Sequence, residues 1–403
     1  MARRRPDPDP TPEVLFVKTR MLLPVIALAC LLALPAGASA AGLDKTFFGV
    51  VGDRALFDNR YGVDLSSELG VMRRTGVGTV RVTFSWAYAQ RYRTAAQVPA
   101  AERPGFVDEG GVPTDWAVTD NVVRLAAVQG VEVLPVLLAA PSWTATRPRA
   151  RISPPKDYRA YGRFVTAAVK RYGPNGRFWA QNPTVPRTPI RNWQVWNEPN
   201  GPLFWPGGTI KQYVALLKQG SSAIRRADRG AKVVLAGLFR YSPPALRAIY
   251  RGKARRMFDV VAIHPFTSKL SNVQKILRDV RTVMKRYRDR RKPLWLTELS
   301  WSSALGKVKE EYGFERTEQG QAAELTRAFT TLARKRRSLR LQRVYWYNWM
   351  GVEEPQQNFP FDYAGLRGVK YTRQTFDKPA LAAYRKVAAS LRQCPEAELA
   401  TCR

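Results

Sequence analysis

The sequence predicts an α/β fold, a single eightfold β/α (TIM) barrel. Short β-branched or apolar runs recur along the chain, at residues 46–52, 78–84, 131–138, 191–196, 232–237, 258–264, 293–298 and 343–349. Runs this apolar are typical of strands buried on both faces, as in parallel sheets. Helix-period segments lie between them. Because strand and helix alternate throughout, we expect one barrel. A doubly wound open sheet is the alternative, but the sequence offers no topological switch point for it.

The segments between the runs carry the periodicity of amphipathic helices. Leu65, Leu69 and Met72 are spaced for one helical face. The same spacing recurs over residues 213–224, and a last helix is expected over about 378–392. The segments between the predicted strands can therefore form helices whose apolar faces cover the sheet.

The N-terminal segment has the layout of a secretory signal. An apolar run at 21–35 is preceded by Lys18 and Arg20 and followed by small residues, which predicts cleavage after Ala40. The run is too short and too rich in proline for a membrane span. Met21 is an alternative start, because the segment before it is long for a signal.

The expected organisation is a signal over 1–40 and one barrel domain over 41–403, with a short C-terminal tail. The mature protein would be secreted, extracellular or associated with the cell envelope, without a transmembrane segment. Cys394 and Cys402 would form one small disulfide, with two free thiols as the alternative. The sequence shows no Cys/His cluster with metal-ligand spacing and no phosphate-binding glycine loop, so we expect no cofactor and no metal.

The chain is strongly basic, with 66 Lys and Arg against 32 Asp and Glu and a net charge of +34. Such a balance indicates an anionic surface or polymer as a partner, although an arginine-rich composition without a partner is the alternative. Basic clusters occupy helix ends or the turns before strands, at 73–74, 225–232, 251–256, 285–292 and 334–343. In a barrel these segments lie on the face opposite the active site. We therefore expect that bottom face to contact an anionic cell-envelope polymer, and expect no nucleic-acid partner.

Two carboxylates follow predicted strands at the same end of the barrel. In "QVWNEPNG", residues 194–201, Glu198 ends the fourth strand before Pro199, and Glu298 in "LWLTELSW" ends the seventh. A polar loop start would explain the first stretch alone. Reactive residues of barrels come from the C-terminal ends of strands. Two carboxylates at one mouth are what the cleavage of a glycosidic bond needs.

"WNEPN" on the fourth strand with "TELSW" on the seventh resembles the clan A glycoside hydrolases, with flanking residues most similar to families 39 and 5. The segment "LLAAPSW" lacks a histidine common in family 5, which favours family 39. The resemblance implies double displacement at an O-glycosidic bond of a poly- or oligosaccharide, β-linked in most of the clan. Glu198 would be the acid/base and Glu298 the nucleophile, with carboxyl groups about 5–5.5 Å apart. The alternatives are a catalytically silent polysaccharide-binding barrel and a basic polyanion-binding structural protein.

The resemblance assigns further residues to the substrate site. Asn197 matches the residue that binds the sugar 2-hydroxyl, Arg81 the neighbour of the nucleophile, His264 the sixth-strand histidine and Trp349 the sugar platform. A structural ion pair is the alternative for Arg81, and a satisfied polar group is the alternative for His264. Phe266 replaces a tyrosine that often hydrogen-bonds the nucleophile, so other groups must orient that carboxylate.

Tryptophans also gather at or just beyond strand ends. We call these the rim tryptophans: Trp86, Trp143, Trp205, Trp301 and Trp349. Flat apolar faces with a polar edge suit sugar rings, so we expect these residues to bind substrate, with core packing as the alternative. Trp193 and Trp295 lie within strands and are expected to pack in the core.

Overall fold

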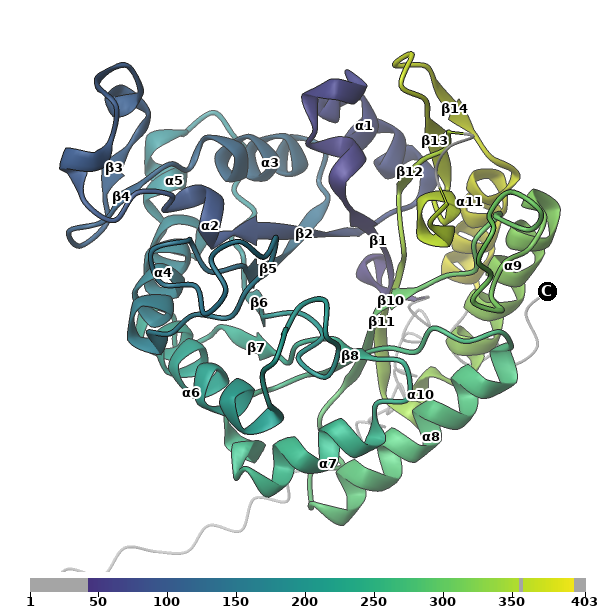
Figure 1. Cartoon of the computed structure of the whole chain (residues 1–403). Coiled ribbons are helices and arrows are strands. Elements are labelled where there is room, and N and C mark those ends of the chain that lie inside the picture. The colour runs from purple at the N-terminus through teal and green to yellow at the C-terminus, as the bar shows by residue number, and fades with distance from the viewer. Residues whose placement is uncertain (1–42, 355–357, 395–403) are drawn as a thin grey trace, which may run out of the picture. The chain divides into compact units, whose positions relative to one another are not determined.

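The computed structural model describes residues 43–354 and 358–394, which contain a TIM-barrel-type parallel sheet (Figure 1). The order of its strands is β7-β6-β5-β2-β1-β11-β10-β9-β8, and every neighbouring pair is parallel. The strands are β1 Phe48–Gly52, β2 Thr79–Ser85, β5 Glu132–Leu138, β6 Asn192–Val195, β7 Lys232–Val234, β8 Leu238–Phe239, β9 Val261–His264, β10 Leu294–Leu299 and β11 Leu341–Trp346.

The run expected as one strand over 232–237 is divided into β7 and β8. Side chains bind the backbone between them, since the N–H of Ala236 donates to Tyr213 Oη and the carbonyl of Leu235 accepts from Gln194 Nε2. β7 pairs with β6 and β8 pairs with β9, so the two halves stand at the two ends of the strand order. The N–H of Leu235 also donates to the carbonyl of Val260 at 3.0 Å.

Helices surround the sheet (Figure 1). They are α1 Leu65–Thr75, α2 Trp86–Ala89, α3 Ala117–Val128, α4 Tyr158–Tyr172, α5 Arg177–Gln181, α6 Ile210–Ala227, α7 Pro243–Arg251, α8 Leu270–Arg286, α9 Glu318–Arg334, α10 Arg336–Leu339 and α11 Pro379–Gln393. Local sequence sets the ends of α1, because Asp64 accepts hydrogen bonds from the N–H groups of Ser66 and Ser67 and Gly76 takes the left-handed conformation with φ of 93°. The expected face of α6, at residues 213–224, is buried.

Smaller strands lie apart from the barrel sheet. β3 Val107–Asp108 and β4 Pro113–Thr114 form a hairpin, and β12 Met350–Val352, β13 Arg367–Val369 and β14 Thr375–Asp377 form a small sheet. Among the described residues no helix is both long and apolar enough to cross a membrane. The expected signal at 1–40 and Cys402 of the expected disulfide lie outside the described residues.

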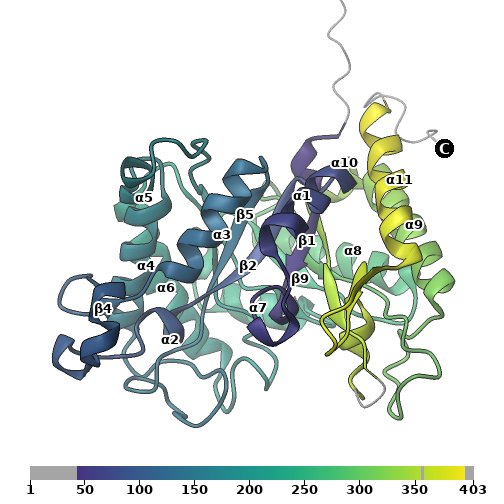
Figure 2. The ribbon, with the colours of Figure 1, turned by 90° about the horizontal axis from the view of Figure 1, so that it is seen from above.

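The two ends of the parallel strands carry different elements. In Figure 2, α2 and β4, which follow β2 in the chain, lie on one side, and α10, which directly precedes β11, lies on the other. The C-terminal strand ends therefore face the first side, where a barrel places its active site. Apolar side chains pack on both faces of the sheet, and Trp193 and Trp295 are buried among them as expected.

Candidate active site

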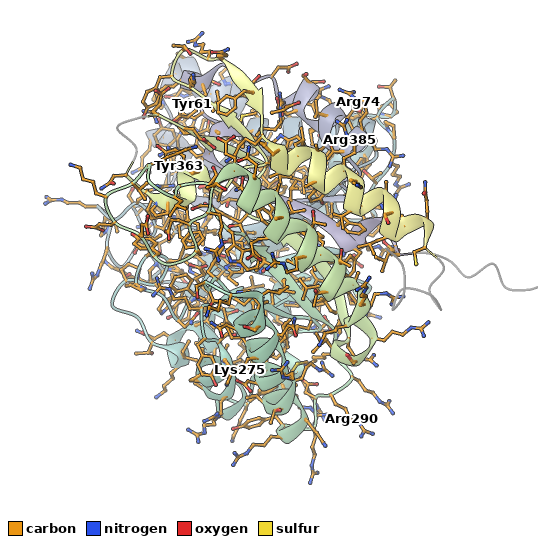
Figure 3. All side chains as sticks on the ribbon, turned by 90° about the vertical axis from the view of Figure 1, so that its right-hand side faces the viewer. Tyr61, Arg74, Lys275, Arg290, Tyr363 and Arg385 are labelled. Carbon is orange, nitrogen blue, oxygen red and sulfur yellow. The ribbon has the colours of Figure 1, made fainter. Side chains whose placement is uncertain are left out.

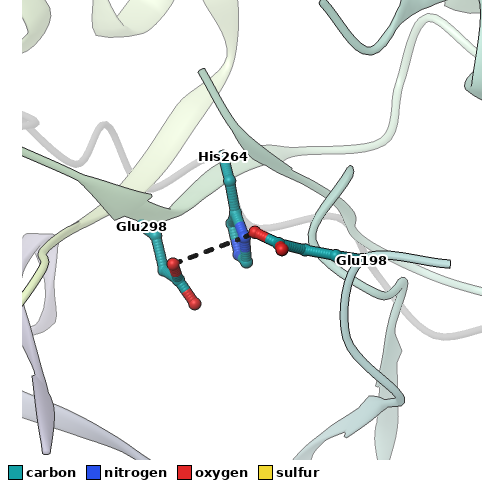
Figure 4. A group of neighbouring side chains, drawn as sticks. All are labelled: Glu198, His264 and Glu298. Atoms are coloured by element: carbon teal, nitrogen blue, oxygen red, sulfur yellow. Dashed lines mark hydrogen bonds and ion pairs between the residues drawn. The ribbon is translucent and has the colours of Figure 1, made fainter. Parts of the chain in front are cut away.

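The chain turns sharply where β6 ends, and this turn positions Glu198. Trp196 and Glu198 both have positive φ, at 72° and 41°, in a region that disfavours residues other than glycine. The N–H of Glu198 donates to the carbonyl of Gly237, and Pro199 cannot continue a strand ladder. His264 ends β9 and Glu298 lies near the end of β10, so three strands bring their polar side chains to one place (Figure 4).

A buried histidine lies between the two glutamates. Nδ1 of His264 is 2.6 Å from Oε1 of Glu198 and 3.6 Å from Oε2 of Glu298. Glu198 and Glu298 are only 6% and 7% exposed, and His264 has no exposed surface. One carboxylate oxygen from each glutamate and one ring nitrogen lie within 4.8 Å of one another. The arrangement therefore lets two carboxyl groups act on the same small space.

Arg81 on β2 donates three hydrogen bonds, one of which holds Glu298, the candidate nucleophile. Its Nη1 donates to Oε1 of Glu298 at 2.7 Å, its Nη2 to Oδ1 of Asn197 at 2.6 Å and its Nε to Oε1 of Gln194 at 2.7 Å. Arg81 thus supplies the contact that orients Glu298 where Phe266 cannot, and the same guanidinium fixes Asn197.

The surroundings of the two carboxyl groups raise their pKa values to different extents. Burial, followed by the charge of Glu298, raises the pKa of Glu198 well above its usual range. Burial also raises the pKa of Glu298, to about 7, while Arg81 opposes that rise through charge and a hydrogen bond. Burial lowers the pKa of His264, so its ring is neutral. These shifts favour a state in which Glu198 holds its proton, while Glu298 is the more readily ionised of the two.

The same three side chains could offer ligand atoms to a metal ion. A cation there would compete with the guanidinium of Arg81, which already pairs with Glu298. It would also displace the short contact between His264 and Glu198. The donor set is therefore already engaged in contacts that suit proton transfer and covalent attack, and we assign no metal to it.

Most of the rim tryptophans are buried, although they were expected to bind substrate at the rim of the barrel. Trp86, Trp205, Trp301 and Trp349 are 0 to 2% exposed, and Trp143 is partly exposed. Trp349 donates through Nε1 to Oε2 of Glu68 on α1, and Trp205 packs edge-on against Trp196. Their indole faces are covered by neighbouring elements, so only Trp143 among the five offers surface to a ligand in this structure.

Residues that the sequence did not single out complete the site. Tyr347, just after β11, is partly exposed, donates to Oδ2 of Asp53 at 2.7 Å, and has its pKa raised by burial and by the charges of Asp53 and Glu298. Thr297 lies 2.9 Å from Nε2 of His264, and Gln194 binds Arg81. A polar residue inside an apolar strand was the available signal for Gln194 and Thr297.

Comparison with known proteins relates this chain to glycoside hydrolases. The sequence model of the glycosyl hydrolases family 39 matches residues 117–315. A beta-xylosidase of Caldicellulosiruptor saccharolyticus is 30% identical over 106 residues, which cover 25% of this chain and 19% of that protein. A beta-xylosidase of Geobacillus stearothermophilus is 26% identical over 142 residues, covering 34% of this chain and 26% of that protein. The matched segments thus span about a fifth to a quarter of those two relatives.

The fold is also similar to solved structures. A family 39 glycoside hydrolase from the gut symbiont Bacteroides cellulosilyticus WH2 aligns with a TM-score of 0.60 and 16% identity, over 88% of this chain and 65% of that one. At this identity the likeness concerns the fold alone.

Proposed function

The chain is a clan A glycoside hydrolase of the family 39 type, and we propose that it is a retaining glycosidase. One observation carries the proposal: an oxygen of Glu198 and an oxygen of Glu298 lie within 4.8 Å of each other. Retaining enzymes place their two carboxyl groups about 5–5.5 Å apart, whereas inverting enzymes need roughly 6.5–9.5 Å to admit a water molecule. The observed spacing favours retention.

In the proposed reaction each carboxyl group has one task. An oxygen of Glu298, which Arg81 keeps available as an anion, forms a bond to the anomeric carbon while the glycosidic bond breaks. Glu198 gives its proton to the departing oxygen. In the second step Glu198 takes a proton from water, the water oxygen bonds to the anomeric carbon, and Glu298 is released. His264 orients Glu198 throughout, and Asn197 faces the sugar 2-hydroxyl.

For the substrate we propose a β-linked glycan, with a β-xyloside as the first glycone to test. Support comes from the two relatives, which are named as beta-xylosidases. The partly exposed rings of Tyr347 and Trp143 offer apolar faces to a sugar ring. The alternative, a silent polysaccharide-binding barrel, would bind glycan without hydrolysing any glycoside.

A panel of 4-nitrophenyl glycosides tests the proposal, with proton NMR identifying the anomer that is released first. We expect retention. Glu298→Gln should abolish turnover without unfolding the barrel, and Glu198→Ala should spare substrates whose leaving groups need little protonation. Glu318→Gln, a change at the start of α9, is the matched control and should leave turnover unchanged. Inversion, or equal losses of Glu198→Ala on activated and unactivated substrates, would contradict the proposal.

We further propose that β7 and β8 are two halves of one strand, so that the sheet is a closed eightfold barrel. They are three residues apart in the chain, and a bridge between Val234 and Val260 with the bond from Leu235 joins the two ends of the strand order. Secretion by cleavage after Ala40 is likewise a proposal, which N-terminal sequencing of the exported protein would test.

The basic bottom face is proposed as the contact to an anionic cell-envelope polymer. In Figure 3, Arg74 and Arg290 lie toward one end of the molecule and Tyr61 and Tyr363 toward the other. The end of α8 and the turn that leads to β10 carry exposed basic residues without a carboxylate partner in the described ranges: Lys285, Arg286, Arg288, Arg290 and Arg291. Replacing them with Gln should weaken salt-sensitive binding to an anionic polymer and leave turnover of a small glycoside unchanged. A parallel fall in turnover would contradict this division of faces.

A further inference from the structure

A pocket of about 310 Å³ opens where the chain leaves the C-terminal ends of β8 and β9. Arg240, which directly follows β8, lies on its wall, and we call it the Arg240 pocket. Its lining comes from the loops after three strands and from the 3₁₀ turn at Pro360–Tyr363. The lining residues are Arg240, Phe266, Thr267, Ser268, Tyr312, Gly313, Phe314 and Phe361. None of these residues takes part in the proposed chemical steps.

The walls of the Arg240 pocket are mostly aromatic. The ring of Phe361 lies 4.9 Å from that of Phe266 and 4.8 Å from that of Phe314. Tyr312 is 44% exposed at the outer edge, so part of its ring is free for contact. Phe266 and Phe361 also contact the ring of Tyr347, so the pocket adjoins the catalytic centre. Such rings suit the C–H faces of a sugar.

Arg240 gives this aromatic pocket a positive charge. The backbone N–H of Arg240 donates to the carbonyl of His264 at 2.9 Å, which fixes the residue next to the site. Its guanidinium carbon lies 5.0 Å from the ring centre of Phe239, and the residue is exposed. No carboxylate of the described residues pairs with it. An exposed, unpaired guanidinium is free to bind a planar anion with two parallel hydrogen bonds.

The charge of Arg240 acts on the acid/base side of the site. Together with Arg81, it opposes the effect of burial on the pKa of Glu198, and it is not among the charges that act on Glu298, which are those of Arg81 and Asp53. Glu198 is the group that would protonate the departing oxygen, so a residue beside Glu198 faces the leaving group. The charges of Asp53 and Tyr347 are coupled to Glu298, the group that would attack the sugar.

We propose that the Arg240 pocket is a leaving-group subsite for a sugar residue that carries a carboxylate, a uronic acid. The aromatic walls cover the sugar ring and the guanidinium of Arg240 binds its carboxylate. This inference rests on the proposed glycosidase function and adds the chemical class of the leaving group. It makes Arg240 a specificity-determining residue without a part in the chemical steps.

The first test compares two aryl glycosides with the same glycone, one with a 4-carboxyphenyl and one with a 4-carbamoylphenyl leaving group. The two leaving groups have nearly the same shape and differ in charge. In Arg240→Gln, the kcat/KM of the 4-carboxyphenyl glycoside divided by that of the 4-carbamoylphenyl glycoside should fall about tenfold, because a hydrogen-bonded charge pair is removed. The loss should be confined to the carboxylated substrate. Arg385→Gln, which removes the same charge from the exposed face of α11, is the control and should leave the ratio unchanged.

The second test compares disaccharides in which the same glycone is linked to glucose or to glucuronic acid. The wild-type protein should prefer the uronate, and Arg240→Gln should lose that preference. If Arg240→Gln changed neither the aryl-glycoside ratio nor the preference between the two disaccharides, the inference would be overturned. If it changed only the ratio for the aryl glycosides, the assignment of the subsite to a sugar acid would be overturned. Turnover of no glycoside at all would instead contradict the proposed function itself, and this inference with it.

Discussion

Nδ1 of His264 lies 2.6 Å from Oε1 of Glu198, and both residues are buried. The other ring nitrogen of His264 lies 2.9 Å from the hydroxyl of Thr297. A neutral imidazole has one N–H and one acceptor nitrogen. When Glu198 holds its proton it donates to Nδ1, and Nε2–H donates to Thr297. When Glu198 is ionised, Nδ1–H donates to it and the hydroxyl of Thr297 donates to Nε2. The tautomer of His264 therefore depends on whether Glu198 is protonated.

Thr297→Val tests this coupling. Without the hydroxyl, a protonated Glu198 leaves the buried Nε2–H without an acceptor, whereas an ionised Glu198 leaves only a lone pair without a donor. The orphaned donor is the costlier of the two. We therefore expect the alkaline limb of the kcat/KM profile to move to lower pH, by up to about one unit. Thr297→Ser should restore the limb, and Thr282→Val on the exposed side of α8 should not move it. A shift to higher pH would contradict the coupling.

Glu198→Gln should change how stability depends on pH. Burial raises the pKa of Glu198 in the folded protein, so the folded state binds this proton more tightly than the unfolded state. The resulting stabilisation is present below the unfolded pKa and is lost as pH rises through the folded pKa. The glutamine variant lacks this stabilisation, so its Tm relative to wild type should rise as pH increases above the pKa that Glu198 has in the unfolded chain. Glu318→Gln should show a constant difference, and a relative fall for Glu198→Gln would refute the assignment.

Arg81→Lys should damage catalysis while keeping the charge. A lysine ammonium cannot reproduce the planar fork that holds Glu298, Asn197 and Gln194 at once. Misplacement of the nucleophile by such a change costs about 100-fold in kcat/KM. The measurement is steady-state kinetics on a 4-nitrophenyl glycoside, with Tm recorded on the same sample. Arg91→Lys, at an ion pair on the outside of the barrel, is the control, and equal losses in both variants would contradict this role.

The sequence predicted well what local pattern and motif determine. Glu198, His264 and Glu298 were expected at strand ends, and the structure brings them together with Arg81 and Asn197. Apolar runs locate strands because burial on both faces removes polar residues from them. The division between β7 and β8 was missed, because it depends on side chains of α6 and β6 that bind the backbone between them.

The direction of each tryptophan could not be predicted. Trp349 lies at a strand end, but whether its indole turns to the mouth or to α1 depends on Glu68, more than 200 residues away in the chain. Tyr347, two residues earlier, takes the partly exposed position near Glu298 instead. Side chains alternate between the two faces of a strand, but the sequence does not show which face lines the site. Long-range packing therefore determines the direction of each ring.

Lys378→Met should destabilise the protein without affecting the chemistry directly. The ammonium of Lys378 is buried and donates to Oε1 of Glu353, to the hydroxyl of Ser303 and to the carbonyl of Tyr363. Its removal leaves the buried carboxylate of Glu353 without its nearest partner, which costs about 3 kcal/mol. Urea denaturation measures the loss. The double variant Lys378→Met with Glu353→Gln should recover part of it, and a double variant no more stable than the single one would contradict the pair.

Tyr347 and Trp349 should respond in opposite ways, because one ring faces the site and the other is buried against α1. Tyr347→Ala removes the partly exposed ring beside Glu298, so the KM of the folded fraction should rise about tenfold. Tyr347→Phe keeps the ring and loses only the hydrogen bond to Asp53, so its KM should stay within about threefold of wild type. Trp349→Phe leaves Glu68 without the indole donor, so it should lower Tm while the KM of the folded fraction stays near the wild-type value. Steady-state kinetics and thermal unfolding on the same preparations separate these outcomes. A large rise in KM for Trp349→Phe with an unchanged Tm would return the sugar platform to Trp349 and remove it from Tyr347.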